Sequence, residues 1–175
     1  MLPCTLEQLD ALRDECKAMV TKRAGLSAGA AVLPIPGLDL GADVSLLIEM
    51  IPAINKKFGL APEQIEGLDP KIKRVILIGA TSLGNKMIGK WVTQQLVMQM
   101  LQRLGIRVAT KSVAKFVPFL GQALAASISF GAMKMLGNAH VDDCYAVAKK
   151  ALLAQQPEQI RVIEVTPDMV EIARR

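Results

Sequence analysis

The sequence contains few aromatic residues. Phe, Trp and Tyr make up only 3% of its 175 residues, although hydrophobic residues make up 51%. This balance is typical of packed helices rather than of a β-sandwich or barrel, which are richer in aromatic side chains. A chain of this length fits one domain with a substantial core. We therefore predict an all-α fold, a compact helical bundle spanning residues 1–175.

Cysteine and histidine are also scarce, and this limits the chemistry available. The three cysteines, Cys4, Cys16 and Cys144, form no pair with metal-ligand spacing, and their odd number argues against a disulfide framework. His140 is the single histidine, and we expect it to be a hydrogen-bonded surface residue. A zinc site or a hydrolytic triad would need more such side chains. We therefore predict no catalytic residues, no metal and no cofactor.

The start of the chain lacks the features of an export signal. No charged segment followed by an apolar run is found there. We expect a cytoplasmic protein. A peripheral position on the cytoplasmic face of a membrane also fits this prediction.

Acidic residues are absent from a long central segment. Residues 70–141 carry ten basic and no acidic side chains, whereas residues 1–69 carry ten acidic and six basic ones. Such a cationic segment, interleaved with apolar runs, is typical of helices that face anionic lipid or an acidic protein. The candidate binding residues are Lys71, Lys73, Arg74, Lys86, Lys90, Arg103, Arg107 and Lys111.

Two alternative roles for this segment stay open. It can be a solvated face that complements the acidic N-terminal block within one bundle. It can also attract nucleic acid, although Trp91 is the only aromatic residue between Phe58 and Phe116, so surfaces for base stacking are lacking. We therefore regard nucleic acid as an unlikely partner.

Two similar motifs predict the starts of helices. The first contains Pro34, Pro36 and Gly37, and the second contains Pro118 and Gly121. Proline suits the first helical turn, so each motif is expected to open a helix of a hairpin. Small residues then recur every fourth position, at Gly37 and Gly41 and at Ala123, Ser127 and Gly131, which predicts close helix pairing.

Local signals divide the chain further. An amphipathic helix is expected over residues 1–25, a helix over 38–58 with a kink at Pro52, and a long helical stretch after Asp69 that glycines at 79, 84, 89 and 105 divide. Separate helices are expected over 119–138 and 142–155, with Asp142 and Asp143 as acids at a helix N-terminus. The tail, 156–175, can contain a short strand or an extended arm.

One segment matches the phosphate-binding loop spacing in part. Gly84, Gly89 and Lys90 have the required spacing, but Trp91 stands where a magnesium-binding hydroxyl is needed. No alternation of strands and helices follows the motif. We therefore interpret it as a basic segment broken by glycines.

Residues 28–60 and 114–152 together resemble the C-terminal helical domain of immunity-related GTPases, and more loosely the helical domain of YcjF-type membrane proteins. The matching features are the two Pro-Gly turns, Asp43 in an apolar helix, Phe58-Gly59-Leu60, Ile128-Ser129-Phe130 and the acidic pair at Asp142. The resemblance extends over residues 28–152. It implies a helical region that associates with membranes and with copies of itself, but the nucleotide-binding domain of the family has no counterpart here.

These observations together predict a non-enzymatic module that associates with membranes or with proteins. The expected partners are an anionic membrane surface or an acidic protein, with a GTPase acting in trans or a second copy of the chain as further possibilities. Two alternatives stay open: a membrane-inserting, pore-type effector, and a soluble homo-oligomeric adaptor.

Overall fold

The computed structural model describes the backbone of residues 2–31, 38–103 and 118–155, and side chains over 2–28, 44–99 and 130–155. Within these ranges the regular structure is entirely helical, which confirms the all-α prediction. The helices are α1 (Leu6–Ala31), α2 (Leu38–Lys57), α3 (Pro62–Glu66), α4 (Pro70–Ser82), α5 (Gln94–Arg103) and α6 (Pro118–Gln155).

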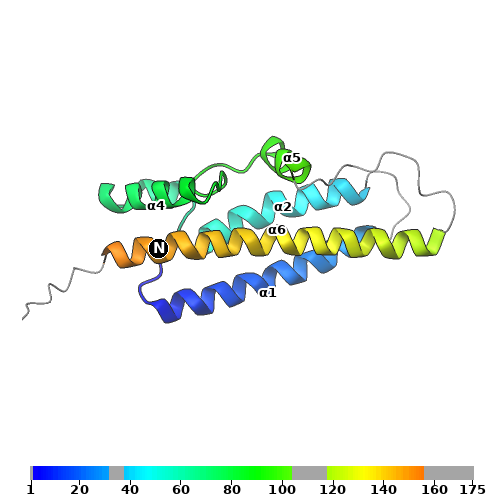
Figure 1. Ribbon diagram of the computed structural model, residues 1–175, viewed down its shortest axis with the longest axis horizontal. Helices are drawn as coiled ribbons and strands as arrows, with labels where there is room; N and C mark the ends of the chain where they lie inside the picture. Colours follow the sequence, from blue (N-terminus) through cyan, green and yellow to red (C-terminus); the bar gives the residue numbers. More distant parts are fainter. Residues whose placement is uncertain (1, 32–37, 104–117, 156–175) are drawn as a thin grey trace, which may run out of the picture.

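Helix α6 is the element on which the bundle is assembled. It is 38 residues long and contacts α1, α2 and α4. Helix α1 also contacts α2, and α2 contacts α5. In Figure 1, α1 lies on one side of α6, while α2, α4 and α5 lie on the other. The predicted bundle is therefore elongated along α6.

Several helix boundaries follow the sequence signals. Asp69 caps α4 by accepting a hydrogen bond from the Lys71 amide at 2.8 Å, and Pro70 occupies the first turn. Gly59 adopts a positive φ of 72° just after α2, a conformation that glycine tolerates best. Helix α6 begins at Pro118 and α2 at Leu38, directly after Gly37. The first Pro-Gly motif itself, with Pro34 and Pro36, lies outside the described residues.

Other predicted boundaries are wrong. Helix α1 continues to Ala31 rather than ending near residue 25. The predicted break at Gly79 is wrong, because Gly79 lies inside α4, buried against Val147 of α6. The predicted breaks at Gly84 and Gly89 are confirmed, with φ of +68° and +69° in the segment after α4. Gly105 lies outside the described residues. The segment 74–79 is helical, so the partial phosphate-loop motif lacks the preceding strand that such a loop requires.

The two helices predicted over 119–138 and 142–155 are one continuous helix. Asp142 does not mark a helix start. Its carboxylate instead pairs with Arg13 and Lys17 of α1 at 2.7 and 2.9 Å, so the acid connects two helices that pack side by side. The C-terminal tail, 156–175, and its expected strand lie outside the described residues.

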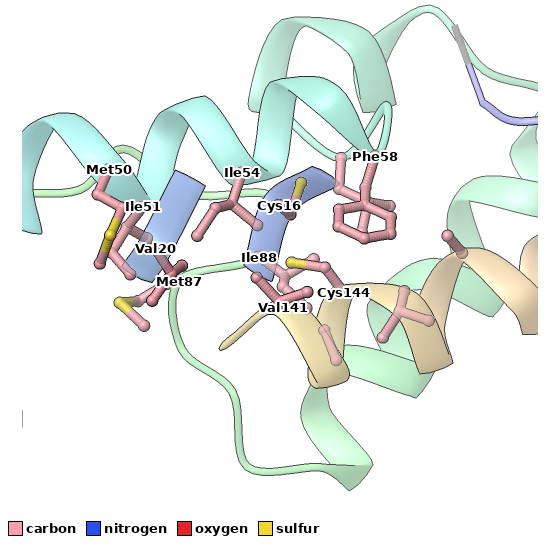
Figure 2. Close-up of a cluster of buried hydrophobic side chains, with 14 of the residues drawn as sticks. Cys16, Val20, Met50, Ile51, Ile54, Phe58, Met87, Ile88, Val141 and Cys144 are labelled. Carbon is pink, nitrogen blue, oxygen red and sulfur yellow. The ribbon is translucent and has the colours of Figure 1, made fainter. Parts of the chain in front are cut away.

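The hydrophobic core forms where α1, α2, α6 and the segment after α4 converge. Figure 2 shows Val20, Ile54, Met87 and Val141 pointing toward one another from these four elements. All four side chains are at most 2% exposed. Burial of apolar surface at this junction is the main force that holds α2 and the segment after α4 against α6.

Helices α1 and α6 approach each other closely at Gly137. A Cβ atom added there would lie 2.5 Å from Val20 Cγ1 and 3.0 Å from Met50 Cε. A Cβ at Gly131 would meet nothing within 4 Å. The small-residue stripe predicted through Gly131 therefore does not mark a close contact at that position, whereas Gly137 does. The side chains of the other stripe positions lie outside the described residues.

We predict opposite effects of alanine at these two glycines. Gly137→Ala should lower the free energy of unfolding by roughly 1–3 kcal/mol, because Val20 cannot move away without disturbing the core. Gly131→Ala, the matched control, should raise it by up to about 1 kcal/mol, because alanine favours the helix. Urea unfolding followed by circular dichroism measures both. Equal effects of the two substitutions would contradict the close packing at Gly137.

Candidate functional site

Helix α4 has one face in the core and one face in solvent. Ile72, Ile76 and Gly79 are buried toward α6, where Gly79 lies against Val147. Lys71, Arg74 and Ile78 follow helical spacing along the opposite side and are exposed. The outer face of α4 therefore combines positive charge with an apolar side chain.

The segment after α4 extends this outer face. Trp91 is 76% exposed and Ile78 is 62% exposed, and Leu77 and Leu83 are also exposed. The position of a Cβ at Gly89 would be 3.9 Å from Leu77 Cδ2, so Gly89 lies beside the Leu77 side chain of α4. We call the following set the α4 surface: Lys71, Arg74, Leu77, Ile78, Leu83, Lys86, Lys90 and Trp91.

Four cations of the predicted set are exposed in the described part of the chain. Lys71, Arg74, Lys86 and Lys90 are exposed on the α4 surface, while Lys73 is half-buried. The side chains of Arg103, Arg107 and Lys111 lie outside the described residues.

Ion pairs in the described part of the chain involve other groups. Arg13 and Lys17 pair with Asp142, and Lys57 pairs with Glu15 at 2.6 Å. The acidic N-terminal block therefore pairs there with Lys57 of α2, and no cation of the α4 surface forms an ion pair with a described residue. This does not support the interpretation in which the N-terminal acids complement the central cations.

A polar network connects the segment 83–93 to α6 and α2, and it is buried at His140 and Asn55. Asn85 donates from Nδ2 to Asp143 Oδ2 at 2.8 Å and lies 3.1 Å from His140 Nδ1. Its Oδ1 accepts hydrogen bonds from the amides of Met87 and Ile88. Asn85 therefore holds the segment that carries Lys86, Lys90 and Trp91 against α6.

His140 is at the centre of this network, and the prediction of a surface histidine is wrong because the side chain is only 2% exposed. Its Nε2 lies 2.9 Å from Asn55 Oδ1, and Asn55 Nδ2 donates to the carbonyl of Met87 at 2.9 Å. This pattern assigns the Nε2–H tautomer, with Nδ1 accepting from Asn85. Burial lowers the pKa of His140 to about 4, so the imidazole is neutral near pH 7.

Cys144 completes a Cys-His-Asn cluster that has the composition of a nucleophilic site. Its Sγ lies 3.5 Å from His140 Nε2 and 3.4 Å from Asn55 Oδ1. Burial raises the pKa of the Cys144 thiol well above its ordinary value and leaves the sulfur without solvent access. An activated cysteine needs a lowered pKa and an accessible thiolate, so these groups serve packing and hydrogen bonding here.

Two other kinds of site are absent from the described residues. No group of His, Cys, Asp and Glu side chains there is arranged to hold a metal ion. Within the same ranges, no helix is both long and apolar enough to cross a bilayer.

Comparison with known proteins identifies one distant relative. The chain is 27% identical over 162 residues to "Interferon-inducible GTPase 5" of Bos taurus, an alignment that includes 89% of the chain. It spans about a third of that relative, 34% of its length. No family model matches the chain, and no solved structure matches it. This likeness supports, in part, the resemblance to the helical region of immunity-related GTPases.

Sequence reasoning missed the apolar half of the α4 surface and the network below it. Ile78 follows Arg74 by four residues and Lys71 by seven, a helical spacing that the sequence displays. Asn55 and Asn85 gave no signal, because an asparagine after α4 is as typical of an exposed turn as of a buried contact.

We predict that the protein loses stability on acidification between pH 6.5 and pH 4. Unfolded histidine binds a proton near pH 6.5, whereas buried His140 binds one only near pH 4. Within this window the unfolded state holds more protons, so the free energy of unfolding should fall by on the order of 3 kcal/mol. Urea unfolding at several pH values measures this slope.

Two variants identify the residue responsible for the slope. His140→Gln should flatten it, whatever its effect on stability at pH 7. Asp142→Asn, the control, should retain the His140 contribution while removing that of the Asp142 carboxylate, whose pKa is lowered because hydrogen bonds from Lys17 and Arg13 outweigh its burial. An unchanged slope in His140→Gln would show that His140 does not cause the acid sensitivity.

Proposed function

We propose that this chain is a non-enzymatic helical module that docks on anionic membrane surfaces through the α4 surface. The observation that carries the proposal is the composition of that surface. The α4 surface combines four exposed cations, none of which forms an ion pair with a described residue, with the exposed apolar side chains of Leu77, Ile78 and Trp91.

Two forces would act together at such a surface. Each Lys or Arg near an anionic leaflet contributes about 1 kcal/mol of attraction, which salt weakens. Trp side chains favour the interface between headgroups and hydrocarbon, where the ring is buried and its N–H stays hydrated. The cations of the α4 surface would therefore supply the long-range attraction, and Trp91 would supply the burial of apolar area at contact.

The proposal fits the likeness to the bovine GTPase without transferring its enzymatic activity. The alignment includes about a third of that protein, and the described part of this chain contains only helices. A GTPase partner acting in trans, and a location on the cytoplasmic face of a membrane, belong to the proposal. An acidic protein or a second copy of the chain would be alternative partners for the same surface.

The first experiment is flotation of the purified chain with liposomes. We expect binding to vesicles that contain phosphatidylserine, weak binding to neutral phosphatidylcholine vesicles, and loss of the difference as salt rises. The double variant Lys71→Gln/Arg74→Gln should lower binding to anionic vesicles roughly 30-fold at low salt, because two attractive charges are removed.

The matched control is Lys22→Gln/Lys56→Gln, which removes the same charge from exposed positions on α1 and α2. It should bind almost as the unchanged protein does. Equal losses in the two double variants would mean that net charge, and not the α4 surface, determines binding. Binding that does not distinguish anionic from neutral vesicles would contradict the electrostatic part of the proposal.

The second experiment tests the apolar part. Trp91→Ala should weaken binding to anionic vesicles roughly tenfold, because the ring no longer buries its area at the interface. Leu26→Ala is the control, since Leu26 on α1 is 61% exposed but lies outside the α4 surface. Emission of Trp91, the single tryptophan, should also shift to the blue when vesicles are added.

Other outcomes would favour the alternatives. Absence of vesicle binding together with a dimer in size-exclusion chromatography would favour a homo-oligomeric adaptor. Leakage of vesicle contents would favour a pore-type effector over peripheral docking.

A further inference from the structure

The network below the α4 surface is compatible with only one protonation state of His140. Asn85 Oδ1 already accepts from two main-chain amides, at 2.8 and 3.2 Å, so this side chain cannot rotate to offer its oxygen to the imidazole. Its Nδ2 therefore faces His140 Nδ1 as a donor, and Nδ1 must be an unprotonated acceptor.

The hydrogen-bonding role of the second ring nitrogen, Nε2, is also fixed. Asn55 donates from Nδ2 to the Met87 carbonyl, which leaves its Oδ1 as the acceptor for His140 Nε2–H. A proton added at Nδ1 would place two donors against each other at 3.1 Å, on an imidazole that is itself only 2% exposed.

We propose that the contact between His140 and Asn85 is an acid-sensitive latch: protonation of His140 releases the segment 83–93 from α6 and uncovers Met87 and Ile88. These two side chains are each only 2% exposed while the latch is closed. Met87 and Ile88 stand four and three residues before Trp91, within the segment that carries Lys86 and Lys90.

The groups around His140 decide how it responds to pH. Helix α6 contributes Asp143, which is bonded to Asn85, and the Cys144 thiol; α1 contributes the Cys16 thiol, which interacts electrostatically with Cys144. Helix α2 contributes the uncharged Asn55 and the segment 83–93 contributes Asn85. Among the described residues, Asp143 is thus the only carboxylate joined to this network, and its bond goes to Asn85 rather than to the ring.

Opening of the latch would strengthen docking, a step that rests on the proposed function. Release adds the buried area of Met87 and Ile88 to the apolar part of the α4 surface. Binding to anionic vesicles should therefore increase as pH falls from 7 to 5, while the latch itself opens whether or not lipid is present.

Hydrogen–deuterium exchange of the full chain without lipid tests the latch directly. The amides of Met87, Ile88 and Gly89 are hydrogen-bonded when it is closed, with Gly89 donating to the Leu60 carbonyl at 3.2 Å. After correction for intrinsic chemistry, their opening should be roughly twentyfold more populated at pH 5 than at pH 7, since the open state binds the proton as ordinary histidine does. Peptides from residues 141–152 should stay protected, which distinguishes local release from global unfolding.

The informative variant exchanges two side chains. In Asn85→Asp/Asp143→Asn, residue 85 would accept from both a protonated Nδ1 and the new amide at 143, and net charge is unchanged. Acid should then close the contact rather than open it, so the pH dependence of exchange should vanish or reverse. His140→Gln, which cannot titrate, should remove the pH dependence. Asp142→Asn should retain it, because Asp142 pairs with α1 and not with this network.

Each outcome decides for or against the latch. Protection of residues 87–89 that does not change between pH 7 and pH 5, or an acid response that persists in both the exchanged variant and His140→Gln, would overturn it. Flotation at pH 7 tests the proposed function separately: loss of vesicle binding with an intact acid response in exchange would reject membrane docking and keep the latch.

Discussion

Polar side chains in an apolar interior must find a partner for every donor and acceptor, and this constraint determines how the centre of the molecule is built. Asn55, Asn85 and His140 meet between α2, the segment 83–93 and α6 with their polar atoms matched. An unmatched buried group costs about 1–3 kcal/mol, so these side chains fix one another's orientation. The segment 83–93 has no regular structure before α5, and hydrogen bonds between its main chain and the side chains of Asn55 and Asn85 hold it in one conformation.

Much of the fold could be predicted because its signals are local. The helix expected over 38–58 and the helix expected after Asp69 depend on neighbouring residues, and both appear, as α2 (Leu38–Lys57) and as α4 starting at Pro70. The continuity of α6 could not be predicted in this way. Gly137 and Asp142 look like a helix end and a helix start, but Val20 explains the first and Arg13 and Lys17 explain the second. Both reasons lie more than a hundred residues away along the chain, where local patterns give no information.

The candidate site was predictable only in its charge. A segment without acidic residues shows that positive charge will accumulate, and four of the predicted cations are exposed. Which apolar side chains are exposed together with these cations depends on the rotation of α4 about its own axis. Positions 72 and 78 are both isoleucine, yet Ile72 is 6% exposed and Ile78 is 62% exposed. The contact between Gly79 of α4 and Val147 of α6 sets which side of α4 is buried, and no sequence motif predicts this contact.

The surface and the core are therefore not independent parts of this molecule. The positions of Lys90 and Trp91 depend on Asn85, which precedes them in the same segment and is hydrogen-bonded to His140 and Asp143 of α6. A substitution in the buried network would move the exposed residues without changing their chemistry, whereas a substitution on the α4 surface would leave the network intact. A change in docking caused by substitution of Asn85 or His140 would thus be an effect on positioning, and it would come with reduced amide protection of residues 87–89. A loss caused by Arg74 or Trp91 would leave amide protection unchanged.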